Sequence, residues 1–299
     1  MAVRLATGPV SWGVDFADAP DNPPWHEVLD EIAECDVDAL ELGPIGYLPT
    51  DPEILGGELA SRGLTAVGSF VFDDFHDPAQ RERVLVATEQ AARVIATAGG
   101  SVIVLIDRPS AARVLTSGRS SEAPRLDDAA RQAFHAALGA AAAIGERHGL
   151  RAAVHPHAGS YLEFEDELER LVDETDLGLC LDTGHLVFAG ADPVALIERH
   201  AERLVHLHLK DVAAAVLADV VAQRLDFWVA IDRGVFCPLG EGAVDVAGVL
   251  GALDRAGYEG FATLEQDRVP GRGSPVDDVN AGVRVVRRHQ ASTRGGHRG

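Results

Sequence analysis

Short apolar runs alternate with longer amphipathic stretches along almost the whole chain. The short runs are rich in aliphatic and β-branched residues, which is typical of buried strands. Strands are predicted near 3–12, 37–42, 64–71, 101–106, 150–155, 177–182, 204–209 and 260–265. Helices are predicted between and after them, near 23–35, 51–63, 79–98, 125–148, 164–175, 192–203, 245–257 and 276–289. This order indicates parallel strands joined by helices.

Three of the predicted helices begin with an aspartate followed by a proline, at Asp51, Asp77 and Asp192. The carboxylate can cap the helix, and proline fits its first turn. Repeated strand–helix units without a change in composition favour an α/β fold, a single-domain (β/α)8 barrel, over residues 1–290. No GxGxxG turn follows the first strand, which argues against a dinucleotide-binding sheet. Residues 291–299 are predicted to form a flexible basic tail.

Two long segments interrupt the alternation, at 107–124 and 211–244. Each follows a predicted strand. In barrels of this kind the loops after the strands build the active site, so both segments are expected to form walls or lids there.

The composition is that of a globular protein, with 46% hydrophobic residues and a formal net charge of −21. Such a charge repels phosphate backbones and anionic lipids, so neither a nucleic acid nor a membrane is an expected partner. The cysteines Cys35, Cys180 and Cys237 form no CxxC pair, which argues against a disulfide framework. No signal peptide is recognisable, so a cytoplasmic location is expected.

Chemically versatile side chains gather at the predicted carboxyl ends of the strands, which converge on one pocket in a barrel. They are Trp12, Glu41, His155, His157, Asp182, His185, His206, His208, Lys210, Glu265 and Asp267. A lone histidine at a strand end is more often structural. Nitrogen and oxygen ligands from four consecutive strands instead suit one divalent metal ion, Mn, Co, Zn or Mg. The predicted ligands are His155, Asp182, His208 and Glu265.

The seventh strand places His206, His208 and Lys210 on the same face, because side chains alternate along a strand. If that face points inward, His208 is a ligand, His206 supports it from below and Lys210 lies at the pocket mouth. Lys210 is the only lysine in the sequence. Lys210→Arg is therefore expected to lower activity far more than stability.

Several motifs at these strand ends and in the insertions resemble one known family. They are Asp21-Asn-Pro-Pro-Trp25, Ala39-Leu-Glu-Leu-Gly-Pro44, Val154-His-Pro-His-Ala-Gly159, Cys180-Leu-Asp-Thr-Gly-His185, His206-Leu-His-Leu-Lys-Asp211 and Phe236-Cys-Pro-Leu-Gly-Glu-Gly242. Over residues 3–290 the chain resembles the xylose-isomerase-like TIM barrels, a superfamily of sugar isomerases and epimerases, and within it the inosose dehydratases. Members usually have Glu as the ligand from strand five. Here His155 stands at that position, so His157 or Glu163 remains an alternative ligand.

The resemblance implies a metal-dependent dehydratase of a cyclic polyol ketone such as inosose, or an isomerase or epimerase on the same site. It implies one divalent metal ion, a small polyol or sugar substrate, and a homodimer or homotetramer. Glu41, His157 and His185 are expected to transfer protons, and Lys210 to hold an oxyanion or hydroxyl. The expected substrate contacts are Trp12, His206, Trp228 and Glu241.

Two other classes compete with this interpretation. An endonuclease acting at abasic sites shares the barrel, but the net charge of −21 argues against a DNA partner. A catalytically inactive binding protein is disfavoured because all four ligand candidates are in place.

Overall fold

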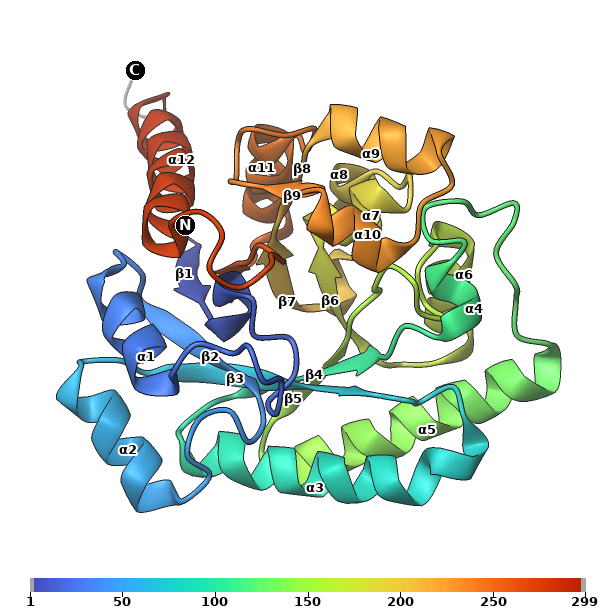
Figure 1. Cartoon of the computed structure of the whole chain (residues 1–299), viewed down its shortest axis with the longest axis horizontal. Helices are drawn as coiled ribbons and strands as arrows, with labels where there is room; N and C mark the ends of the chain where they lie inside the picture. Colours follow the sequence, from blue (N-terminus) through green and yellow to red (C-terminus); the bar gives the residue numbers. More distant parts are fainter. Residues whose placement is uncertain (1–2, 297–299) are drawn as a thin grey trace.

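The strands close into a parallel barrel in a computed structural model that describes residues 3–296 (Figure 1). Around the barrel the strands follow the order β1-β10-β7-β6-β5-β4-β3-β2. Their bounds are β1 (Arg4–Thr7), β2 (Ala39–Pro44), β3 (Ala66–Asp73), β4 (Val102–Asp107), β5 (Arg151–Val154), β6 (Gly178–Asp182), β7 (Leu204–Leu209) and β10 (Phe261–Leu264). The predicted fold class is confirmed.

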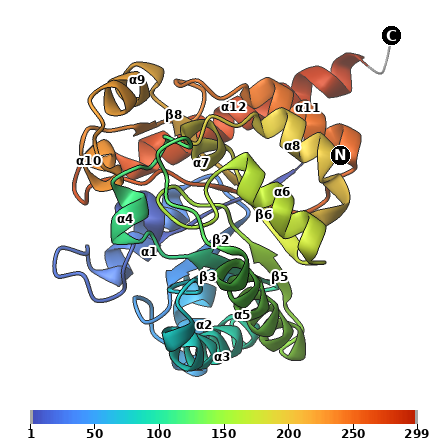
Figure 2. The same ribbon diagram turned by 90° about the vertical axis from the view of Figure 1, so that its right-hand side faces the viewer.

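Helices surround the barrel and bury their apolar faces against it (Figures 1 and 2). They are α1 (Trp25–Glu34), α2 (Pro52–Ser61), α3 (Arg81–Thr97), α5 (Asp128–Arg147), α6 (Glu165–Glu174), α8 (Pro193–Arg199), α11 (Val246–Ala256) and α12 (Pro275–Gly296). A shorter helix, α7 (Thr183–Phe188), directly follows β6. Among the helices of residues 3–296, none is both long and apolar enough to cross a bilayer.

The predicted capping aspartates occupy their expected places. Asp51, Asp77 and Asp192 each accept a hydrogen bond from the backbone N–H two residues on, at 3.0, 2.9 and 2.9 Å. The caps of Asp51 and Asp192 start α2 and α8, whereas that of Asp77 starts a 3-10 turn just before α3. Each cap contributes about 1 kcal/mol to helix stability.

The first strand is shorter than predicted. Proline at position 9 has no N–H for the sheet, so β1 ends at Thr7 and Pro9–Trp12 forms a 3-10 turn, η1. At the other end, α12 continues as a helix through residues 291–296, where the sequence predicted a tail, and 297–299 lie outside the described residues.

The two insertions touch each other. The segment 107–124 contains α4 (Ala111–Val114), and the segment 211–244 contains β8 (Asp211–Val212), α9 (Ala214–Ala222), α10 (Phe227–Asp232) and β9 (Phe236–Cys237). An ion pair of 2.6 Å joins Arg224 to Glu122, and Figure 2 shows α4 beside α10. The longer insertion walls the main pocket. The shorter one contributes no lining residue to that pocket and instead packs on the loop after β5.

Apolar side chains that point into the barrel form its interior and the floor of the site. Phe70 and Ile106 belong to this buried inner cluster and also line the pocket above it. The filled interior therefore confines ligands to the end of the barrel.

Candidate active site

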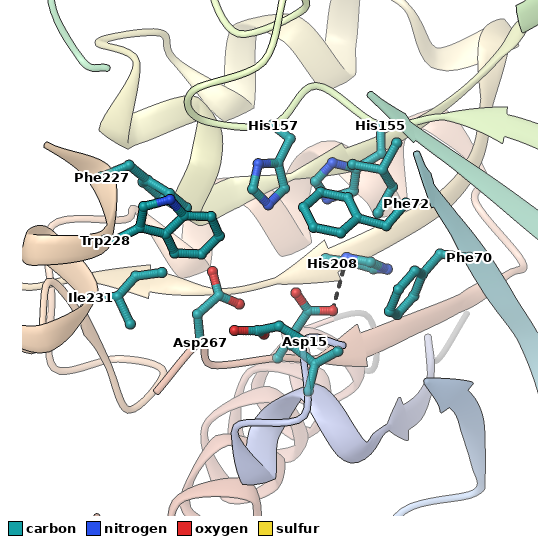
Figure 3. A pocket seen from close by; sticks show the side chains of 13 residues that line it. Asp15, Phe70, Phe72, His155, His157, His208, Phe227, Trp228, Ile231 and Asp267 are labelled. Carbon is teal, nitrogen blue, oxygen red and sulfur yellow. Dashed lines mark ion pairs between the residues drawn. The ribbon is translucent and has the colours of Figure 1, made fainter. Parts of the chain in front are cut away.

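The main pocket opens at the carboxyl ends of the barrel strands and contains about 480 Å³ of empty space. Figure 3 shows two histidines on one wall, two aspartates on the facing wall and aromatic rings of α10 at the side. Its lining consists of Val10, Asp15, Phe70, Phe72, Ile106, His155, His157, His208, Phe227, Trp228, Ile231, Glu265 and Asp267. The pocket thus lies where the sequence predicted it.

The four predicted metal ligands lie together. His155 Nε2 is 3.5 Å from Asp182 Oδ2, while His208 Nδ1 is 3.6 Å from that oxygen and 3.2 Å from Glu265 Oε2. Asp182 on β6 stands in register with His208 on β7, which explains their proximity. Asp182 Oδ2 and His208 Nδ1 are buried and have no hydrogen bond within the described residues.

Glu41 fixes which nitrogen of His208 faces this cluster. Its Oε1 accepts hydrogen bonds from His208 Nε2 at 3.1 Å, His206 Nε2 at 2.6 Å and Thr263 Oγ1 at 2.5 Å. Burial alone raises the pKa of Glu41, but His208 and His206 outweigh it and hold that pKa well below its usual value. Burial lowers the pKa of His208, but Cys180, Glu265 and Glu41 outweigh burial and raise that pKa well above its usual value, so Nδ1 also holds a proton between the carboxylates. A metal ion that displaces this proton would meet the lone pair of Nδ1, while Nε2 keeps its hydrogen bond to Glu41.

Ligand atoms of Asp182, His208 and Glu265 lie within 4.8 Å of one another, and His155 shares such a group with Asp182 and His185. A cation beside Asp182 would satisfy its unpaired Oδ2, so the residues fit a divalent metal ion.

Lys210 lies beside the same carboxylates. Its Nζ is 2.6 Å from Glu265 Oε1, 2.7 Å from Asp267 Oδ1, 3.3 Å from Asp182 Oδ2 and 3.1 Å from His185 Nε2. Burial lowers its pKa, but the three carboxylates outweigh burial and keep that pKa well above the usual value. The ammonium group therefore holds these acids in place, and Lys210 is not among the residues that line the pocket.

The burial of Lys210 changes one prediction from the sequence. Its side chain is fully buried and its stem packs so closely on Gly184 that a Cβ there would lie 2.5 Å from Lys210 Cγ. Lys210→Arg is therefore expected to lower the free energy of unfolding by about 1–3 kcal/mol, because a larger side chain overpacks this space. Activity should fall as well. Urea unfolding measures this loss. A free energy of unfolding equal to that of the wild type would contradict it.

His157 and His185 stack with ring centroids 4.0 Å apart. His157 Nδ1 donates to the carbonyl of Ala158 at 2.8 Å, and the N–H of Ala158 donates to His185 Nδ1 at 3.2 Å. Burial is the main cause that lowers the pKa of both rings well below the usual value. Burial thus favours the neutral form of both rings. Because Nδ1 of His157 donates to Ala158, the neutral ring carries its lone pair on Nε2.

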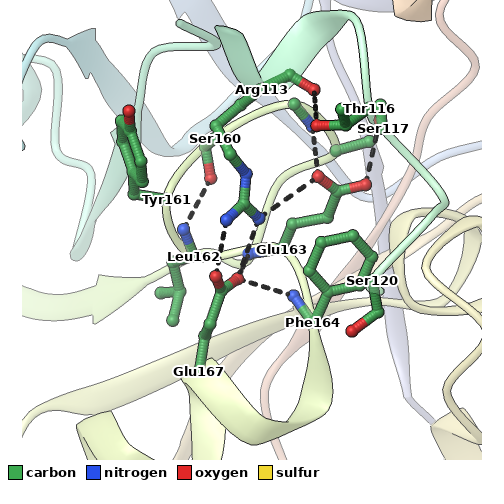
Figure 4. Close-up of polar contacts among 12 residues, drawn as sticks. Arg113, Thr116, Ser117, Ser120, Ser160, Tyr161, Leu162, Glu163, Phe164 and Glu167 are labelled. Carbon is green, nitrogen blue, oxygen red and sulfur yellow. Dashed lines mark hydrogen bonds and ion pairs between the residues drawn. The ribbon is translucent and has the colours of Figure 1, made fainter. Parts of the chain in front are cut away.

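Glu163, the alternative ligand from strand five, is bound elsewhere (Figure 4). Its carboxylate accepts hydrogen bonds from Ser117 Oγ at 2.9 Å, Gly118 N at 2.6 Å and Gly159 N at 3.0 Å, and pairs with Arg113 at 3.4 Å. These contacts tie the loop after β5 to the insertion 107–124. His155, which adjoins Asp182, is the better ligand candidate.

Glu163→Gln is expected to lower the free energy of unfolding by about 1–3 kcal/mol and to leave bound metal unchanged. The reason is that Arg113 loses a buried negative partner, while the metal cluster lies elsewhere. Metal analysis alongside urea unfolding measures both effects. His155→Gln is the matched variant, which should lose metal. Loss of metal in Glu163→Gln would identify Glu163 as the ligand.

Of the four predicted substrate contacts, one lines the pocket and three do not. Trp228 lines the pocket and is 39% exposed. Trp12 does not line it, because η1 turns the indole into the core, where Nε1 donates to Glu31 at 2.6 Å. Glu241 lies exposed in the longer insertion, and His206 lies buried beneath the pocket with Glu41. We therefore leave Trp12, Glu241 and His206 out of the proposed substrate contacts.

Comparison with known proteins shows the family of this chain. The family described as xylose isomerase-like TIM barrel matches residues 29–289. The chain belongs to this family. Within it, the inosose dehydratase of Erwinia tasmaniensis is 28% identical over 293 residues, which cover 96% of this chain and 97% of that protein.

Solved structures share the fold of this xylose isomerase-like barrel. L-ribulose 3-epimerase superposes with a TM-score of 0.73 at 15% identity, covering 100% of this chain and 97% of the other. The IOLI protein with a bound zinc atom superposes with a TM-score of 0.70 at 14% identity, covering 96% and 98%. At these identities the likeness shows the fold alone.

The sequence missed one charged residue of this xylose isomerase-like site. Asp15, in the loop after η1, lines the pocket. Asp267, at the carboxyl end of the eighth predicted strand, also lines the pocket, next to Lys210. A search of every loop that follows a strand, the first included, would have found Asp15.

Proposed function

We propose that the chain is a metal-dependent dehydratase that acts on a cyclic polyol ketone such as inosose. The observation that carries this proposal is the cluster of candidate ligand atoms from His155, Asp182, His208 and Glu265 beside the ring of His157. The inosose dehydratase that matches along almost the whole chain supports the substrate class.

His155, Asp182, His208 and Glu265 would hold the ion, for which Mn, Co, Zn and Mg are the candidates. When bound, such an ion supplies Lewis acidity that makes a hydrogen on the carbon beside a ketone easier to remove. Glu41 positions His208, and Lys210 positions Glu265 and Asp182. These two residues act through the ligands rather than on substrate.

His157 is the base in this proposal. Figure 3 shows its ring directed into the pocket, and the bond from Nδ1 to the carbonyl of Ala158 leaves Nε2 able to accept a proton. Phe72 and Phe227 lie against the ring at centroid distances of 5.3 and 5.5 Å and hold it in this orientation. His157 would remove the proton on the carbon beside the ketone, and loss of the hydroxyl on the next carbon completes dehydration.

The test is incubation of the purified protein with inosose and Mn or Co in deuterated water, followed by NMR and by absorbance of a conjugated product. We expect loss of water and a new ultraviolet band. Deuterium incorporation at carbon without loss of water would replace the dehydratase with an isomerase or epimerase. If the metal-loaded protein neither releases water from inosose nor incorporates deuterium, the proposal is rejected.

A further inference from the structure

Asp15 presents a carboxyl group to the pocket that the protein itself does not use. Among the described residues it has no hydrogen bond and no ion pair, although it lines the pocket and is half-buried. Figure 3 shows it beside Asp267, on the wall that faces His155 and His157. A carboxyl group without a protein partner at this place is available to a substrate hydroxyl.

The chain holds Asp15 in this position by its local conformation. Gly13 has a φ of 84°, and a Cβ there would lie 2.8 Å from the nitrogen of Pro270 and 2.9 Å from the carbonyl oxygen of Arg268. Only glycine allows this close approach. Gly13 thus packs the loop after η1 against the segment after β10, and the next residue, Val14, is completely buried.

The surroundings of Asp15 favour its protonated form. Burial is the main cause that raises the pKa of Asp15, and the negative charges of Asp267, Glu265 and Asp21 raise it further. Lys210 partly opposes them, and the resulting pKa is about 7. An aspartate on the protein surface would be fully ionised at neutral pH. Asp15 can therefore keep a proton where an ordinary aspartate cannot.

Other acid candidates are less suitable. Glu41 lies beneath His208 and does not line the pocket. The carboxylate of Asp267 accepts a hydrogen bond from Lys210 at 2.7 Å. His185 lies between the N–H of Ala158 and Lys210, behind the ring of His157, and does not itself line the pocket.

We propose that Asp15 is the catalytic acid that protonates the departing hydroxyl, an inference that rests on the proposed dehydratase function. His157 takes the proton from the carbon beside the ketone, and the electrons of that bond form the new carbon–carbon double bond. The carbon–oxygen bond on the next carbon breaks, and its electrons stay with oxygen. Asp15 gives that oxygen a proton, and water leaves. His157 has gained one proton and Asp15 has lost one, so transfer through solvent restores both without any oxidant or reductant.

The experiment compares Asp15→Asn with the wild type on inosose and on an analogue in which fluorine replaces the departing hydroxyl. Fluoride leaves without a proton, so only the hydroxyl substrate needs the acid. We expect kcat of Asp15→Asn to fall about 10²- to 10⁴-fold on inosose and less than about tenfold on the fluoro analogue. Exchange of the hydrogen beside the ketone with deuterated water should continue, because His157 is intact.

Asp18→Asn is the matched control, since it removes the same charge from an exposed position in the same loop. It should behave as the wild type on both substrates. Equal losses on the two substrates, or no loss at all in Asp15→Asn, would overturn the role of Asp15 while the dehydratase function stands. A wild type that does not dehydrate inosose would instead overturn the proposed function, and this inference with it. If Asp15→Asn does not fold, Asp15→Ser on the same two substrates decides the question.

Discussion

Asp182→Asn is expected to abolish binding of the divalent ion and to lower kcat more than about 100-fold, because supporting groups around metal ligands alone change affinity or activity 10- to 100-fold. The fold should survive. Oδ1 of Asp182 caps α7 by accepting from Gly184 N at 2.8 Å and His185 N at 2.9 Å, and asparagine keeps such an oxygen. Oδ2, which faces His155 and His208, becomes an amide nitrogen without charge or free lone pair.

Metal content of the purified variant, its turnover and its urea unfolding curve measure the three parts of this expectation. Asp192→Asn is the control, because Asp192 also caps a helix, α8, but lies exposed on the surface of the barrel. It should keep metal, activity and stability. Stoichiometric metal in Asp182→Asn would remove Asp182 from the proposed ligand set.

The barrel and the proximity of the four candidate ligands could be predicted because they follow from periodicity. Alternation along a strand sets which side chains point inward, and closure of the barrel brings the ends of all strands together. His155, Asp182, His208 and Glu265 needed no further information. Their distances in the structure agree with that reasoning.

Depth within the barrel could not be predicted in the same way. Glu41 points inward as expected, yet it lies beneath His208, because alternation fixes the face of a side chain and not its height. Trp12 was misplaced for a different reason. The chain leaves β1 at Thr7 and turns through η1, so the strand periodicity no longer applies at Trp12.

Which loop residues reach the pocket depends on contacts between segments that are distant in the sequence. Asp15 reaches the pocket because Gly13 lets its loop pack on Arg268 and Pro270. Nothing local at Asp15 signals this contact, since it joins the first loop to the last. Glu163 presents the converse case. It has the side chain that the resemblance implied for the ligand of strand five, but backbone N–H groups and Arg113 already occupy its oxygens.

His157→Gln is expected to lower kcat by about 10²- to 10⁴-fold, the usual contribution of a general base. Glutamine has no basic nitrogen in place of the lone pair on Nε2. Metal content should be unchanged, because within the described residues His157 belongs to none of the groups of close His, Cys, Asp and Glu ligand atoms.

The decisive measurement for His157 is hydrogen exchange beside the ketone in deuterated water, followed by NMR. A base removes that hydrogen before water leaves, so His157→Gln should lose exchange and dehydration together, whereas Asp15→Asn should lose dehydration alone. His148→Gln is the control, since His148 pairs with Glu89 at 2.6 Å on the outside of the barrel and should change neither rate. Exchange at the wild-type rate in His157→Gln would show that another group removes the proton and would leave His157 as a wall of the pocket.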